Sequence, residues 1–270
     1  MRQTNKPIPE EIQEFLEMYK QLLLEVLPAN RVHGIYLYGS LALHSFDPDT
    51  SDIDFITIIK GRIGKKTEDL LKLVHLRCNS HPYGLRMDGC YVTLDQVGMV
   101  YEELEEYPFF ADGKLHKGHY DLNYITWWTL QTKGITAYGE PISVLNLNMK
   151  WEDVQKTLTY NLNTYWKEKL ERDMCFFYDD WIEFGVITLC RILLSLEYRN
   201  IFSKKEAVAR ARALLPAQYH PILLEGLRLR TNPRSDSYYH SKEIRKQDMR
   251  RFVAFTISYF NETYELQNSI

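Results

Sequence analysis

The chain has 270 residues, of which 45% are hydrophobic, and its formal net charge is -3. This length accommodates one large core or two moderate ones, and the near-neutral charge argues against a strong general affinity for nucleic acid. No apolar run approaches the length of a membrane span, and residues 1–6 lack a signal-peptide core. We therefore expect a cytosolic protein without nucleic-acid or membrane partners.

Hydrophobic periodicity predicts a helix over about residues 9–27, and then strands and helices alternate. Strands are expected at about 33–38, 53–60 and 85–93, with a helix at about 67–78. This order is typical of a small α/β unit. A further helix at about 121–133 should end at Gly134, and residues 139–141 have the composition of a turn.

Strand signals almost disappear after Trp151, and long helical periods replace them. Helices are expected at about 151–172, 180–198, 203–214, 217–228 and 241–265, with a polar loop at about 228–240. We therefore predict an α/β domain over residues 1–150 and an all-α helical bundle over residues 151–270. The four cysteines, Cys78, Cys90, Cys175 and Cys190, lack the short paired spacing of zinc or redox sites and are expected to be free thiols.

Gly39 and Ser40 follow the first predicted strand, and Asp52 and Asp54 stand at the start of the next one. Residues two apart on a strand point to the same face, so the two carboxylates should project together. A cation between them would keep both ionised, and magnesium prefers such hard oxygen ligands. Gly39 lets the main chain approach a phosphate, and Ser40 offers a hydroxyl and an amide. The pattern favours a nucleotide and magnesium site, although an ordinary turn followed by a polar loop would have the same composition.

A complete site needs a third carboxylate on a later strand. Asp88 is the candidate, because it stands at the start of the strand expected at about 85–93. There it could ligate the metal or take a proton from an incoming hydroxyl. The alternative is a loop aspartate in an Asp-Gly turn with Gly89.

Together these patterns resemble the polymerase β-like nucleotidyltransferase superfamily, and within it the spectinomycin/streptomycin adenylyltransferases. In the second half the similar segments are VITLCR at 186–191, IFSK at 201–204 and LPAQYHPILLE at 215–225. With the N-terminal motifs, the resemblance covers most of the chain and is weakest at about 95–120. It implies an N-terminal nucleotidyltransferase domain with a small mixed sheet, followed by the helical domain. The implied reaction is magnesium-dependent transfer of AMP from ATP to a hydroxyl of a small cationic acceptor, such as an aminoglycoside or aminocyclitol antibiotic. The resemblance also implies a role in antibiotic resistance, although the sequence does not determine whether the protein confers it.

The resemblance also assigns roles to residues. Asp52 and Asp54 match the metal-binding aspartates, where two magnesium ions are expected, and Ser40 matches a phosphate-contacting serine. Asp88 matches the glutamate that acts as catalytic base, but it is shorter by one methylene and is therefore a candidate metal ligand as well.

Two basic residues of the second half match the family. Arg191 and Lys204 correspond to residues that reach the ATP phosphates, which implies an active site between the domains. Without the resemblance, Arg191 would be interpreted as a surface arginine, and Lys204 as one of a solvated pair with Lys205.

The acceptor is less well defined by the sequence. Residues 109–114 lack the drug-stacking tryptophan of the family, and Trp181 stands where the family has an acidic drug contact. Asp179, Asp180 and Glu183 lie close by and would attract a cationic acceptor. His119, and His116 with it, are weaker candidates for the same pocket and do not by themselves indicate a metal site. Residues 102–106 are interpreted as a solvated acidic face.

Two other functional classes stay open. A protein-modifying nucleotidyltransferase of the toxin–antitoxin kind shares the motifs but is usually much smaller. A nucleotide-binding or sensor protein without turnover would follow if Asp88 could not replace a glutamate. The acceptor, the nucleotide preference and the oligomeric state are not determined by the sequence.

Overall fold

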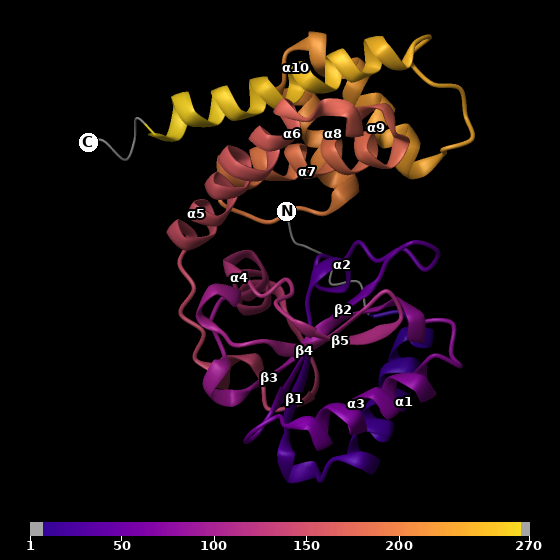
Figure 1. The fold of residues 1–270 in the computed structure, drawn as a ribbon, viewed down its shortest axis with the longest axis vertical. Helices are drawn as coiled ribbons and strands as arrows, with labels where there is room; N and C mark the ends of the chain where they lie inside the picture. Colours follow the sequence, from indigo (N-terminus) through magenta and orange to yellow (C-terminus); the bar gives the residue numbers. More distant parts are fainter. Residues whose placement is uncertain (1–7, 266–270) are drawn as a thin grey trace. The chain divides into compact units, whose positions relative to one another are not determined.

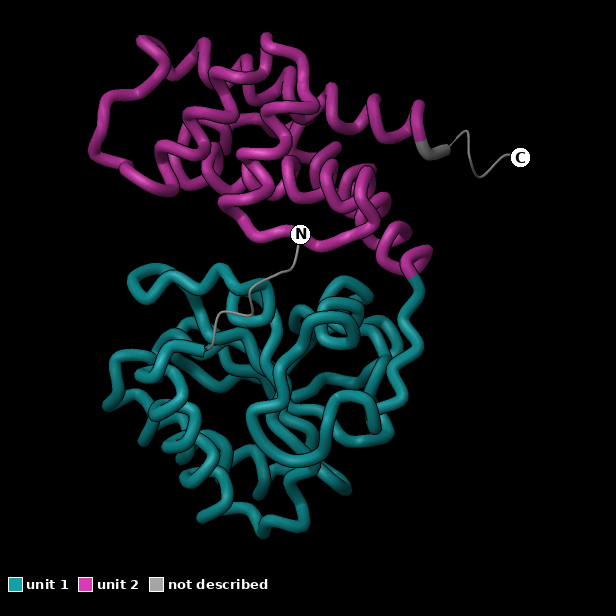
Figure 2. Tube along the Cα trace, turned by 180° about the vertical axis from the view of Figure 1, so that it is seen from behind, with its two compact units in different colours: residues 1–150 teal, residues 151–270 magenta. Residues whose placement is uncertain are grey.

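The computed structural model describes residues 8–265 and divides into two compact units, Met1–Lys150 and Trp151–Ile270 (Figure 2). The first unit combines a sheet with helices, and the second is helical. The predicted fold class is therefore confirmed. All four cysteines are free thiols, as expected.

The first unit contains a six-stranded sheet with the order β5-β4-β3-β2-β1-β6 (Figure 1). Strands β1 (Val32–Leu37), β2 (Ile53–Ile59) and β3 (Met87–Thr93) form its centre, as predicted. β2 and β3 are parallel, and the other neighbouring strands pair antiparallel. The sheet is therefore mixed, and its parallel pair brings the starts of β2 and β3 to the same edge.

The outer strands β4 (Tyr107–Ala111), β5 (Lys114–Gly118) and β6 (Ile135–Gly139) are absent from the sequence prediction. His116, one of the weaker candidates for the acceptor pocket, lies on β5. β5 reads Lys-Leu-His-Lys-Gly and is largely exposed. Such an edge strand carries charged residues in place of a regular apolar alternation, so periodicity does not reveal it.

Helices cover both faces of the sheet (Figure 1). α1 (Glu10–Val26) and α3 (Lys65–Cys78) pack on one face, where Phe55 of β2 belongs to their core. α4 (Tyr124–Lys133) packs on the other, where Ile56 and Ile58 join its Trp127. Burial on both faces explains the continuous apolar run of β2. It also fixes the register, because a one-residue slip would exchange the two cores.

Hydrogen-bonded polar groups cross the core under α1 and α3. The hydroxyl of Tyr19 lies 3.0 Å from the hydroxyl of Thr57 and 2.8 Å from the hydroxyl of Tyr91. The Tyr91 hydroxyl also lies 2.7 Å from His75 Nε2. Burial lowers the pKa of His75 to about 3, so its ring is neutral at ordinary pH. These pairs connect both helices to the sheet and satisfy groups that would otherwise be costly to bury.

The second unit is built around one long apolar helix, α7 (Asp179–Tyr198), which is buried along most of its length. Gly226 of α9 (His220–Thr231) lets this helix approach α7 closely, because a Cβ at that position would lie 2.5 Å from the Cβ of Val186. The helices of this unit are α5 (Trp151–Asn161), continued by the π-helical segment Leu162–Trp166 into α6 (Lys167–Glu171), then α7 (Asp179–Tyr198), α8 (Lys204–Leu214), α9 (His220–Thr231) and α10 (Lys242–Phe260).

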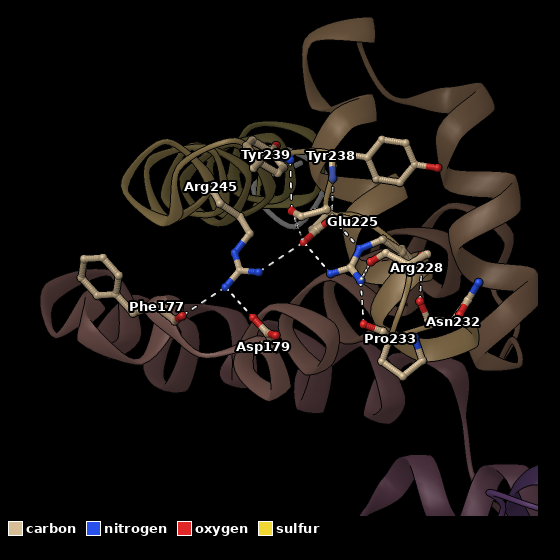
Figure 3. A network of polar contacts seen from close by, with 11 residues as sticks. Phe177, Asp179, Glu225, Arg228, Asn232, Pro233, Tyr238, Tyr239 and Arg245 are labelled. Carbon is tan, nitrogen blue, oxygen red and sulfur yellow. Dashed lines mark hydrogen bonds and ion pairs between the residues drawn. The ribbon is translucent and has the colours of Figure 1, made fainter.

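A buried carboxylate, Glu225 of α9, connects three parts of this unit (Figure 3). Arg228 donates to both of its oxygens at 2.9 Å, and Arg245 of α10 donates to one of them at 3.2 Å. The Ser237 hydroxyl and the Tyr238 amide add bonds of 2.8 and 3.1 Å from the following loop. Arg228 is therefore a buried helical residue, and the prediction that the polar loop begins there is wrong.

The charge of Glu225 is held by these donors. Burial alone would raise its pKa, but the hydrogen bonds from Arg228, Ser237, Tyr238 and Arg245 outweigh burial and lower the pKa to about 2. The folded state thus favours the ionised carboxylate over the range between about pH 2 and the ordinary value of 4.5. Its contribution to stability is present above about pH 4.5 and is lost as the pH falls toward 2.

We expect the Glu225→Gln variant to be destabilised by about 3 kcal/mol at pH 7, because two buried guanidinium groups lose their counter-charge. Urea unfolding measured between pH 2 and pH 7 should show an acid-dependent loss of stability in the parent chain that is smaller in the variant. Glu171→Gln, an exposed change in the same unit, should alter stability by less than about 0.5 kcal/mol. Equal unfolding free energies for the Glu225 variant and the parent at pH 7 would contradict this role.

Candidate functional site

Asp54 and Asp88 face each other in register on the parallel strands β2 and β3. Alternation places both on the sheet face that α4 covers, together with Ile56 and Cys90 of the same strands. Asp52 immediately precedes β2 and has the same parity as Asp54. The alternative of an Asp-Gly turn at Asp88 is wrong, because the residue lies within β3.

The turn after β1 lies directly against the Asp54 carboxylate. The Ser40 amide donates to Asp54 Oδ2 at 3.3 Å, and the Tyr38 amide donates to the Asp54 carbonyl at 3.1 Å. Gly39 has a φ of +57°, and a Cβ on it would lie 1.8 Å from Asp54 Oδ2. Glycine is therefore required both for the backbone conformation and for the close approach. The sequence predicts that the Ser40 amide contacts a phosphate, whereas in this structure it donates to Asp54.

Negative charge accumulates at this edge of the sheet. Burial, and after it the charge of Asp88, raises the pKa of Asp54 to about 7 despite the hydrogen bond from Ser40. Burial also raises the pKa of Asp88, and the charge of Asp52 adds to the rise. Raised carboxyl pKa values indicate that the fold brings these groups together without enough positive charge to balance them.

The donor chemistry fits a magnesium site. Asp52, Asp54 and Asp88 offer hard carboxylate oxygens, which magnesium prefers as ligands. The pKa values of Asp54 and Asp88 are raised, and a cation beside them would favour their ionised forms. Within residues 8–265, no three His, Cys, Asp or Glu side chains converge closely enough to hold a metal ion as they stand. Carboxylates that repel one another are expected to converge only when a cation is present.

Two residues that the sequence analysis does not single out border the carboxylates. The Tyr120 hydroxyl donates to Asp88 Oδ2 at 2.9 Å. Asp121 follows it with a φ of 45°, and its charge raises the pKa of Asp54 further. No motif in the sequence identifies these two residues, which stand just before α4. The pairing of β3 with β4 brings them to the site.

The predicted histidine candidates belong to the β4–β5 hairpin and its continuation. His119 Nε2 lies 2.8 Å from the Leu104 carbonyl, and His116 Nε2 lies 3.2 Å from the Ala111 carbonyl. Both rings thus have backbone partners, and both residues are exposed.

The predicted basic residues lie in the second unit. Arg191 is on α7, and its Nε donates to the carbonyl of Phe202 at 3.0 Å. Phe202 lies in the segment between α7 and α8, so this bond fixes the orientation of the guanidinium. Lys204 is the exposed first residue of α8. The Ser203 hydroxyl caps that helix by accepting from the Glu206 amide at 3.4 Å.

The predicted acceptor carboxylates lie in the first turns of α7. Asp179 pairs with Arg245 at 2.7 Å, and Glu183 pairs with Arg230 at 3.2 Å (Figure 3 shows the Asp179 pair). Asp180 is exposed beside them. Two of the three carboxylates therefore form ion pairs within the helical unit.

Comparisons with known proteins agree with this architecture. Residues 152–258 match the family model described as the aminoglycoside adenylyltransferase C-terminal domain. The crystal structure of spectinomycin adenyltransferase AAD(9) from Enterococcus faecialis with ATP and spectinomycin is similar, with a TM-score of 0.65 and 16% sequence identity. The similarity covers 89% of this chain and 98% of that one. The comparison with curated protein sequences gives no match.

The fold is thus similar to that of the AAD(9) structure, with an α/β unit followed by a helical unit. Residues 152–258, in the helical unit, are similar to the C-terminal domain of aminoglycoside adenylyltransferases. The resemblance stated from the sequence is therefore confirmed for residues 152–258. Within residues 8–265, none of the helices is both long and apolar enough to span a membrane.

We expect the Asp54→Asn variant to be more stable than the parent at pH 8 without divalent cations. The pKa of Asp54 is raised from 3.8 to about 7, so its ionisation opposes folding increasingly as the pH rises from about 4 to about 7. Removing the charge should stabilise the fold by an amount on the order of 1–3 kcal/mol at pH 8 and much less at pH 4. Thermal unfolding at the two pH values measures this difference.

The exposed change Asp69→Asn serves as the control and should show no such dependence on pH. Magnesium should raise the melting temperature of the parent but not that of Asp54→Asn. A lower melting temperature for Asp54→Asn at pH 8 would show that the carboxylate stabilises the cation-free fold, contrary to this account.

Proposed function

We propose that the chain transfers AMP from ATP to a hydroxyl group of a small cationic acceptor, such as an aminoglycoside or aminocyclitol antibiotic. The observation that carries this proposal is the register of Asp54 and Asp88 beside the Gly39 turn. The family match of residues 152–258 supports the acceptor class. The similar AAD(9) structure was determined with ATP and spectinomycin, which supports ATP as the co-substrate.

In this proposal Asp52, Asp54 and Asp88 are the residues that would hold two magnesium ions. Magnesium, when bound, neutralises charge on the triphosphate and favours in-line displacement at the α-phosphorus. Gly39 allows the triphosphate to approach the main chain, and the Ser40 hydroxyl contacts a phosphate. Asp88 accepts the proton of the acceptor hydroxyl, whose oxygen then bonds to the α-phosphorus as pyrophosphate leaves.

We also propose that Arg191 and Lys204 bind the phosphates of ATP. Support comes from their match to the family pattern and from the hydrogen bond that orients Arg191. A guanidinium whose Nε is engaged is held in a fixed plane, and a planar group with several donors suits contact with a phosphate. Loss of Arg191 should therefore weaken ATP binding more than loss of Lys204.

For the acceptor we propose contacts with Asp179, Asp180, Glu183 and His119. A concentration of negative charge attracts a cationic antibiotic. Asp179 and Glu183 already pair with arginines, so a direct contact with either requires the acceptor to share or displace that arginine. Asp180 is therefore the first residue to test.

A nucleotide-binding protein without turnover is the second candidate function. It is favoured by the side chain of Asp88, which is one methylene shorter than the glutamate that it would replace as base. Binding of ATP and magnesium without AMP transfer to any acceptor would distinguish this function from the first.

To test the proposal, the protein is incubated with Mg-ATP and a panel of aminoglycosides, aminocyclitols and lincosamides, and products are analysed by mass spectrometry. At least one acceptor should gain the mass of one AMP. In Asp54→Ala the transfer should fall at least about 100-fold with the fold intact, because the cation loses a central ligand. Turnover by Asp54→Ala at the parental rate would refute the mechanism, and a silent panel would refute the antibiotic acceptor.

A further inference from the structure

Tyr120 contacts the predicted catalytic carboxylate and is held from several sides. Its hydroxyl donates to Asp88 Oδ2 at 2.9 Å. Its ring stacks on Phe109 of β4, with centroids 4.5 Å apart and an angle of 7° between the planes. The hydroxyl of the buried Tyr107 bridges the Tyr120 amide and carbonyl, each at 2.7 Å. Strand β4 therefore holds the backbone and the ring of Tyr120, in addition to the bond that its hydroxyl makes with Asp88.

The direction of this hydrogen bond limits what Asp88 can do. A phenol has a single proton to donate, and a carboxylate is the acceptor. Oδ2 accepts the hydrogen bond from Tyr120. Oδ1 therefore keeps its full capacity to bind a cation or an acceptor hydroxyl. A charge-assisted bond of this kind is stronger than one between neutral groups and restricts rotation of the carboxylate.

We propose that Tyr120 is a positioning residue that reserves Asp88 Oδ2 and presents Oδ1 to the reacting groups. The proposal rests on the AMP transfer proposed above and adds to it a residue that no motif identifies. Its consequence is that Asp88 contributes one oxygen, and not two, to a cation. The short aspartate is thereby kept from chelating the cation with both oxygens, and one oxygen stays oriented to accept a proton.

A purely structural role is the alternative, in which the bond only fastens β4 and the chain after β5 to β3. The two roles make opposite predictions for cation binding. If Tyr120 competes with a cation for Oδ2, its removal should strengthen cation binding while impairing turnover. If it only supports the fold, its removal should weaken both.

Tyr120→Phe separates the roles, because it keeps the ring that stacks on Phe109 and removes only the hydroxyl. Binding of Mn²⁺ to the full-length protein, followed by electron paramagnetic resonance without ATP, should become about fivefold tighter in this variant. With an acceptor from the panel, kcat should fall about tenfold while the KM for ATP changes less than twofold. Thermal unfolding should confirm that the variant is folded.

Two matched variants sharpen the result. Tyr36→Phe removes the hydroxyl of a buried tyrosine in the same unit, which donates to the Glu140 carbonyl at 2.9 Å, and should leave Mn²⁺ affinity unchanged. In an Asp88→Asn background, adding Tyr120→Phe should have no further effect on Mn²⁺ affinity, because the two residues act as a pair.

Unchanged or weaker Mn²⁺ binding by folded Tyr120→Phe would overturn the proposal for Tyr120. That result leaves the proposed function intact, provided that the parent chain binds Mn²⁺ and transfers AMP. A parent chain that binds no Mn²⁺ would instead overturn the proposed function, and the role of Tyr120 with it.

Discussion

The site of the first unit depends on two carboxylates that the fold holds in register, Asp54 and Asp88. Asp54 and Asp88 lie opposite each other because β2 and β3 are parallel and start at the same edge of the sheet. The two buried cores fix this register, so the strands cannot slip to separate the charges. Burial and mutual repulsion raise the pKa of Asp54 to about 7, which is unfavourable for a chain without a cation. A structure that keeps such a pair is suited to bind positive charge there.

The surrounding residues moderate this repulsion without removing it. The Ser40 amide supports Asp54 and the Tyr120 hydroxyl supports Asp88, one donor for each carboxylate. Gly39 is needed for the first of these contacts, because any side chain at that position would collide with Asp54. The same carboxylates retain raised pKa values, so affinity for a cation is preserved. The helical unit contrasts with this arrangement, because Glu225 is matched by two arginines and has a pKa lowered to about 2.

The sequence was sufficient for the central strands and most helices, because their apolar periodicities are strong and local. It also placed Asp52 and Asp54 on one face, since parity along a strand is a local property. Asp88 was a candidate from its place at the start of a later strand and from the family resemblance, because the pairing of β2 with β3 is not local. The edge strand β5 escaped prediction because its exposed residues carry no apolar alternation. The roles of Tyr120 and Asp121 depend on the pairing of β3 with β4, which no local pattern encodes. The polar loop predicted from Arg228 onward also begins too early. Arg228 is buried because it pairs with Glu225, whereas composition alone predicts that an arginine is exposed.

The central claim is that Asp54 and Asp88 form a pair poised to bind a divalent cation. The most direct measurement is a pH titration of the aspartate carboxyl groups by ¹³C NMR, with Asp54→Asn and Asp88→Asn used for assignment. Without divalent cations, one aspartate should titrate near pH 7 and be lost from the spectrum of Asp54→Asn. Saturating magnesium should lower that pKa by at least about two units, because the cation favours the ionised form. An Asp54 signal that titrates near pH 4 and does not respond to magnesium would contradict the account.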